Sequence, residues 1–181
     1  MFVQRVLRDK NIAEYLLYMW QVEDMIRAAG LDSDRLYGSV IKCSGRSESD
    51  CAEWKKWYDD LIEMMHTEGK TKSGHLQINE NVLILLEDLH QRLLESHKQP
   101  EYRDLYYKAL PFIVEFRAKN HSTENEELRD CFNMLYGVWL LRVQGKEVSA
   151  STAQAVKDVS AFIGKLAVLY REDKEGTLEI E

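Results

Sequence analysis

The chain has 181 residues, the length of one domain, and can bury about 70% of its unfolded surface. Apolar residues make up 45% and charged residues 30%, as in ordinary soluble globular proteins. The net charge of −7 argues against a nucleic-acid binder and against a protein that sits on an anionic membrane, because both normally present a basic face.

The N-terminal part predicts a short helix over residues 2–9 and a long one over residues 11–28. Asn11 and Glu14 have the spacing of a capping box, and Gly30 follows the second helix as a typical stop. This long helix is apolar on nearly all sides, so we expect several neighbours to cover it and make it the central helix of the fold.

Three further helices are expected before residue 100. They cover residues 32–42, residues 50–68 with Ser49 as the cap, and residues 76–97. Helical spacing predicts that the two longer ones bury Trp54, Trp57, Tyr58, Leu61, Met64, Met65, Ile78, Val82, Leu85, Leu86, Leu89 and Leu93.

The helix over residues 100–119 begins at Pro100, where the first turn tolerates proline. Pro111 lies inside the same pattern, so we expect a kink or break there. Capping boxes at Thr123 and Ser151 open two more helices. The inward side chains expected from these three helices include Tyr102, Tyr106, Ala109, Ile113, Leu128, Cys131, Phe132, Leu135, Val138, Trp139, Val159, Ile163, Leu166 and Tyr170.

These elements predict an all-α fold. Short connections between long helices favour an up-and-down antiparallel helical bundle of about five long helices plus one or two short ones. Residues 1–174 would form a single domain, and the acidic tail, residues 175–181, would be flexible.

Two segments carry Glu-x-x-His, namely Glu63 with His66 and Glu87 with His90. Together with single glutamates from other helices, they match the ligand count of a carboxylate-bridged di-metal bundle. On the helical wheel, however, Glu63 and His66 point away from the apolar face, and Glu87 lies just beyond it. We therefore favour no metal and no cofactor, and treat a di-metal enzyme as the least favoured hypothesis.

Glu23 is the acid that plainly faces inward, near the middle of the apolar arc of its helix. A buried carboxylate requires a partner, and Arg27 and Arg142 are the candidates. The pair could be an ion pair that fixes helix register or a polar anchor inside a ligand pocket. Such a pocket would be lined by aromatic residues, with Trp20, Trp54 and Trp139 as candidates.

The longest apolar runs, residues 82–86 and 110–114, are far too short to span a bilayer. The first residues are charged and lack the apolar stretch of a secretory signal. The three cysteines, Cys43, Cys51 and Cys131, show no metal-type spacing and indicate reduced thiols in the cytoplasm.

The run NIAEYLLYMWQVEDMIRA, preceded by the basic VLRDK, resembles the N-terminal signature of an uncharacterised bacterial family. The resemblance implies a helical cytoplasmic protein with no assigned activity. We favour a non-enzymatic bundle that acts through protein contacts with an unknown partner or as a homodimer. The alternative is a small-molecule binder with an aromatic pocket around Glu23.

Overall fold

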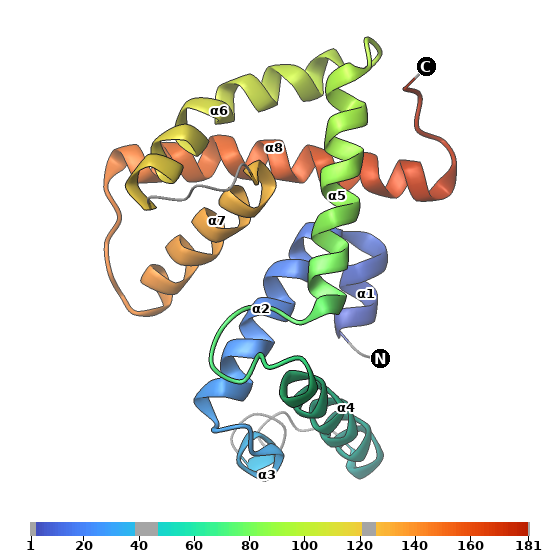
Figure 1. Cartoon of the computed structure of the whole chain (residues 1–181), viewed down its shortest axis with the longest axis vertical. Helices are drawn as coiled ribbons and strands as arrows, with labels where there is room; N and C mark the ends of the chain where they lie inside the picture. The colour runs from blue at the N-terminus through green and yellow to red at the C-terminus, as the bar shows by residue number, and fades with distance from the viewer. Residues whose placement is uncertain (1–2, 39–46, 121–125, 181) are drawn as a thin grey trace. The chain divides into compact units, whose positions relative to one another are not determined.

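The computed structural model describes residues 3–38, 47–120 and 126–180 (Figure 1). Within these ranges it contains eight helices and no strand, which confirms the predicted all-α class. Six of the eight helices have at least 17 residues. The helices are α1 (Val3–Lys10), α2 (Ile12–Ala28), α3 (Ser33–Leu36), α4 (Glu48–Thr67), α5 (Gln77–Glu95), α6 (Pro100–Asn120), α7 (Glu127–Val143) and α8 (Ala150–Glu175).

The chain divides into two compact units. Unit 2 consists of residues 18–81, and unit 1 consists of residues 1–17 and 82–181. Helices α2 and α5 each contribute residues to both units.

Unit 2 holds most of α2, then α3, α4 and the first residues of α5. Helix α3 packs on α4, burying Leu36, and an ion pair of 2.5 Å joins Asp34 to Lys55 at the surface. Inside α4, the Trp54 ring makes an edge contact with Trp57 and a tilted contact with Tyr58, with centroids 5.5 Å and 6.0 Å away. These contacts form an aromatic core under the inner face of α4.

Unit 1 is built mainly from α6, α7 and α8, which pack on one another (Figure 1). Aromatic rings fill the centre of this unit: Phe162 of α8 lies 5.3 Å from Tyr102 and 5.6 Å from Tyr106, centroid to centroid. Other fully or nearly fully buried side chains here are Ala109, Ile113, Leu128, Cys131, Phe132, Val159, Ile163 and Leu166. The predicted burial of Cys131 is confirmed.

Four helices begin with a side chain that accepts from the backbone of the first turn. Asn11 Oδ1 accepts from the N–H groups of Ala13 and Glu14, as its capping spacing predicts. Two predicted caps were wrong, because α4 starts after Ser47 rather than Ser49, and α8 after Ser149 rather than Ser151. Each true cap has extended backbone and accepts from the N–H three residues later, a geometry that a residue inside the first turn lacks.

Of the kink or break predicted at Pro111, the break does not occur, since α6 runs from Pro100 to Asn120 without interruption. Pro111 is exposed, so the carbonyl group that loses its N–H donor at this point can be reached by water. Thr123, the other predicted cap, lies outside the described residues, and α7 instead follows Glu126, which makes no capping hydrogen bond.

Three predicted core residues are exposed. Leu85 is 52% exposed, Trp139 is 39% exposed and Ile78 is 37% exposed. A helical wheel treats the whole apolar arc as buried, whereas each of these helices is covered on only part of that arc. Within the described ranges, none of the helices is long and apolar enough to cross a membrane.

Candidate functional site

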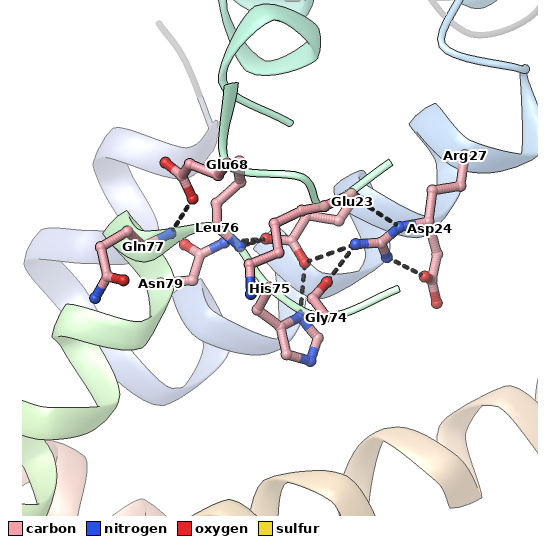
Figure 2. A network of polar contacts seen from close by, with 10 residues as sticks. Glu23, Asp24, Arg27, Glu68, Gly74, His75, Leu76, Gln77 and Asn79 are labelled. Carbon is pink, nitrogen blue, oxygen red and sulfur yellow. Dashed lines mark hydrogen bonds and ion pairs between the residues drawn. The ribbon is translucent and has the colours of Figure 1, made fainter. Parts of the chain in front are cut away.

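Glu23, the predicted inward acid, is fully buried in unit 2 (Figure 2). Its Oε2 atom lies 2.6 Å from His75 Nδ1. Its Oε1 atom accepts from the Leu76 N–H at 2.9 Å and from the Asn79 side-chain amide at 2.6 Å. Both carboxylate oxygens are therefore occupied by protein donors.

Two of these donors, His75 and Leu76, come from the turn that leads into α5, and Asn79 lies in the first turn of that helix. Gly69 and Gly74 have positive φ values of 68° and 81°, which allow tight turns in the segment between α4 and α5. The first N–H groups of α5 have no partners inside the helix. Glu23 accepts from Leu76, and Glu68 at the end of α4 accepts from Gln77 at 2.7 Å. Two glutamates thus cap α5 from other helices, where negative charge also suits the helix dipole.

Arg27 holds the same turn from the other side. Its Nε atom donates to the Lys70 carbonyl at 3.2 Å, and one of its terminal nitrogens donates to the Gly74 carbonyl. It also pairs with Asp24 at 2.8 Å and lies 3.9 Å from Glu23. Arg27 is therefore an ion-pair partner of Glu23, as predicted, but the closest partners are a histidine, an amide and a backbone N–H.

The other residues predicted around Glu23 fall in different places. Trp20 reaches the network through His75, because their rings stack with centroids 4.1 Å apart and an interplanar angle of 11°. Trp54 lies in the α4 aromatic core, while Trp139 belongs to unit 1 and stacks on Tyr136. Arg142 is an exposed residue of α7.

Sequence reasoning missed Glu68, His75 and Asn79. His75 lies between a polar loop and a helix, where a histidine is ordinarily a surface residue or a cap. Asn79 is buried, although an asparagine in the first turn of a helix is ordinarily solvated. No local spacing indicates a contact with a residue more than 50 positions away.

The first Glu-x-x-His pair, Glu63 and His66, is exposed on α4, as the wheel predicted. Among the described residues, no group of three or more His, Cys, Asp or Glu side chains has an arrangement that could hold a metal ion.

The second Glu-x-x-His pair, Glu87 and His90, is not an exposed pair like the first, because His90 is fully buried in unit 1. Its Nδ1 atom lies 2.6 Å from the Tyr102 hydroxyl. Its Nε2 atom lies 3.8 Å from Glu127 Oε2, beyond hydrogen-bond length, and makes no hydrogen bond to a described residue. The Tyr106 hydroxyl donates to the same Glu127 oxygen at 2.8 Å. We call these four residues the His90 cluster.

Burial keeps both phenols of this cluster protonated, because it raises the pKa of Tyr102 and of Tyr106. The Tyr106 hydroxyl is therefore a donor to Glu127. In the contact between the Tyr102 hydroxyl and His90 Nδ1, the tautomer of the ring decides which of the two groups donates.

The pKa values of the two glutamates near His90, Glu127 and Glu87, are shifted in opposite directions. The interaction with His90 holds the pKa of Glu127 below its usual range; burial opposes this shift, and the Tyr106 hydroxyl reinforces it. Burial raises the pKa of Glu87, and the charge of Glu127 adds to this shift while His90 opposes it. The His90 cluster therefore contains one stabilised carboxylate, Glu127, and lies beside Glu87, a carboxyl group that is costly to ionise.

A groove of about 460 Å³ lies between α6, α7 and α8 in unit 1. Most of its wall is apolar, and a few polar groups stand beside that wall. We call it the α6–α8 groove. It is lined by Phe112, Glu115, Phe116, Lys119, Asn133, Met134, Gly137, Val138, Leu141, Ser151, Thr152 and Ala155.

Comparison with known proteins gives one match. A family model described as a domain of unknown function (DUF4924) matches residues 1–177. No curated protein and no solved structure matches the chain.

Proposed function

We propose a binding function for this chain, which belongs to the family described as a domain of unknown function (DUF4924). The protein is a non-enzymatic helical protein whose ligand is a small apolar molecule held in the α6–α8 groove. The observation that carries the proposal is the groove itself, with its volume of about 460 Å³ and its mostly apolar wall.

The size and lining of the groove favour a small molecule. Small-molecule sites are clefts of about 300–1,000 Å³ lined mainly by apolar and aromatic side chains with a few polar groups. Here Phe112 and Phe116 supply aromatic surface, while Asn133, Ser151 and Thr152 supply amide and hydroxyl groups. Lys119 and Glu115 pair with each other at 2.6 Å, so these two rim charges largely neutralise one another.

The Glu23 network supports this location over the predicted pocket around Glu23. A ligand that bound the Glu23 carboxylate would have to displace His75, Leu76 or Asn79, and a buried donor would lose its partner. Leaving such a donor unsatisfied costs about 1–3 kcal/mol. Glu23 therefore acts as a structural acceptor.

Gly137 contributes to the open space of the groove. It lies in the middle of α7, and no neighbouring heavy atom is within 4 Å of the position that a Cβ atom would take. Glycine in a helix interior costs about 0.5–1 kcal/mol relative to alanine, and close packing does not require it here. A larger side chain at this position would extend into space that a ligand would fill.

The test uses a neutral solvatochromic dye, Nile red, with Gly137→Leu and a matched variant, Gly164→Leu. Gly164 also lies inside a helix, with no atom within 4 Å of its Cβ position, but it does not line the groove. We expect saturable dye binding in the original chain, at least tenfold weaker binding in Gly137→Leu, and unchanged binding in Gly164→Leu.

Circular dichroism and the melting temperature confirm that each variant folds. Equal loss of dye binding in both variants, or no saturable binding by the original chain, would contradict a ligand site in the groove.

A second candidate function is self-association through the outer face of α7. Tyr136, Trp139 and Val143 recur at helical spacing, and Val143 is 65% exposed. Burying such side chains against a second copy would remove apolar surface from water. Light scattering over a range of concentrations should detect a dimer that Trp139→Glu disrupts and Val114→Glu, an exposed site on α6, leaves intact. A strict monomer at all concentrations excludes this candidate.

We also propose that the protein works in the cytoplasm. Cys51 and Cys131 are buried with free thiols, a state that a reducing compartment maintains. Cell fractionation with a tagged full-length chain tests the location, and recovery outside the cytoplasmic fraction would contradict it.

A further inference from the structure

A second groove, of about 560 Å³, lies between α1 and the C-terminal half of α8 in unit 1. Its charge differs from that of the rest of the chain. We call it the α1–α8 groove. It is lined by the basic residues Arg5, Arg8, Lys10, Arg171 and Lys174, the acidic residues Asp9 and Glu175, and Ile12, Ala167 and Tyr170.

The groove is net positive in an acidic protein. Five basic and two acidic side chains line it, whereas the whole chain has 24 basic and 31 acidic residues. Cations are common in the last turn of a helix, where they favour the helix dipole, and this explains Arg8, Lys10 and Lys174. The helix dipole does not explain the positions of Arg5 and Arg171, because both lie outside the last turns of their helices and still line the same groove.

Three of the five cations are arginines, and the guanidinium group suits phosphate. Its planar fork of N–H donors can bind two oxygens of one phosphate, and it is more weakly hydrated than an ammonium group. The Arg8 guanidinium lies 5.7 Å from the centroid of the Tyr15 ring, a cation–π contact that positions this side chain in the free protein.

The remaining wall indicates a ligand with an apolar part. Ile12 is buried beneath the groove, and Ala167 and Tyr170 of α8 line it beside the cations. The Tyr170 side chain, half-buried, offers a ring face on which a flat group could stack. A ligand that carried only charge would leave this part of the wall unused.

The overall charge favours a small ligand over an extended polyanion. A nucleic acid or an anionic bilayer would extend beyond the groove, and the net charge of −7 on the whole chain would repel it. Screening reduces these interactions beyond about 8 Å at physiological ionic strength, so a ligand confined to the groove is governed by the local cations.

We propose that the α1–α8 groove binds a small organic phosphate that carries at least two phosphate charges and an apolar, flat moiety. The phosphates pair with the arginines, and the flat moiety packs on Tyr170 and its apolar neighbours. This site is separate from the α6–α8 groove and does not depend on the function proposed for that groove.

The test is isothermal titration calorimetry of the full chain with three probes: ADP, pyrophosphate and adenosine. ADP carries both the two phosphates and a flat ring system. Pyrophosphate carries only the phosphates, and adenosine carries only the ring system. We expect ADP to bind more tightly than pyrophosphate and adenosine to bind weakest, with ADP affinity falling as sodium chloride is raised. The double variant Arg171→Gln, Lys174→Gln should weaken ADP binding at least tenfold.

The matched control is Lys56→Gln, Lys108→Gln, which removes the same charge from two exposed lysines outside the groove. The affinity of this control variant for ADP should lie within twofold of the affinity of the unsubstituted chain. Three results would overturn the proposal: no ADP binding at millimolar concentration, equal weakening by the two double variants, or tighter binding of anionic lipid vesicles than of ADP. Equal affinity for ADP and pyrophosphate would overturn the role of Tyr170.

Discussion

The imidazole ring of His75 stacks on the indole of Trp20, with centroids 4.1 Å apart and an interplanar angle of 11°. The same ring places Nδ1 2.6 Å from Glu23 Oε2. His75 is thus held on its face by an aromatic ring and at its edge by a carboxylate. His75, which joins a loop to a helix, is therefore held in one position at the half-buried edge of the Glu23 network.

Replacing Glu23 tests how far this network supports the fold. Glu23→Leu leaves the Leu76 N–H and the Asn79 amide without their acceptor. We expect it to lower the free energy of unfolding by about 2–4 kcal/mol, measured by urea denaturation. Glu23→Gln keeps one acceptor oxygen for these two donors and should cost about 1 kcal/mol.

Glu63 provides the matched control, because it is a glutamate on an exposed helical face. Glu63→Leu and Glu63→Gln should each change stability by less than about 0.5 kcal/mol. If Glu23→Leu were as stable as the original chain, the network would have no net stabilising role.

The His90 cluster should produce a pH-dependent stability. The pKa of Glu127 is lowered in the folded protein, so its ionised form stabilises the fold above the unfolded pKa of about 4.3. This contribution is lost as the pH falls through the lower, folded pKa. Glu127→Gln should therefore cost about 1–2 kcal/mol at pH 7, and the difference from the original chain should shrink below about pH 4.3.

Glu87 supplies the control, because its pKa is shifted in the opposite direction to that of Glu127. Burial raises its pKa, so its ionised form destabilises the fold, and that penalty appears as the pH rises through the folded pKa. Glu87→Gln should leave stability at pH 7 unchanged or increase it. If Glu127→Gln and Glu87→Gln lowered the free energy of unfolding equally at pH 7, the opposite pKa shifts would not govern stability at these two positions.

Pro111 should lower the stability of α6. Proline inside a helix removes one backbone hydrogen bond and costs about 3 kcal/mol against alanine, partly offset because proline restricts the unfolded chain. Since Pro111 is exposed, Pro111→Ala disturbs no buried side chain. We expect a gain of about 1–3 kcal/mol in urea denaturation. A loss of stability would mean that the local shape imposed by proline is needed for packing.

We predict that residues 1–174 unfold as one domain. Three of the four tryptophans, Trp20, Trp54 and Trp57, lie in unit 2, so in a Trp139→Phe variant fluorescence reports unit 2 alone. Circular dichroism at 222 nm reports helices of both units. Coincident urea transitions by the two signals are expected for a single cooperative domain. Two separated transitions would contradict it.

Local patterns predicted the helices well, and they predicted the contacts between helices poorly. The positions of α2, α5 and α8 follow from apolar periodicity, and the end of α2 also follows from Gly30, both of which are short-range signals. Ser47 and Ser149 were missed because several serines lie near each start, and only backbone geometry selects one. Capping boxes therefore located the starts of α2 and α8 to within two residues, whereas α7 begins three residues after the position that Thr123 predicted.

The burial of Glu23 could be predicted, whereas most of its partners could not. Its helix carries apolar residues on both sides of it, and this signal is local. His75 and Asn79 come from a turn whose placement depends on tertiary packing. His90 is fully buried because Tyr102, Tyr106 and Phe162 cover its ring, and these contacts come from other helices that local periodicity does not reveal.

The contacts of Glu23 join residues that are 52, 53 and 56 positions apart in the chain. Closing a loop of this length costs entropy before the carboxylate gains its donors, so these bonds should form after the individual helices. Interactions absent from the folding transition state act mainly on the rate of unfolding. Glu23 would then govern how long the folded chain persists, while the speed of folding would depend on the helices themselves.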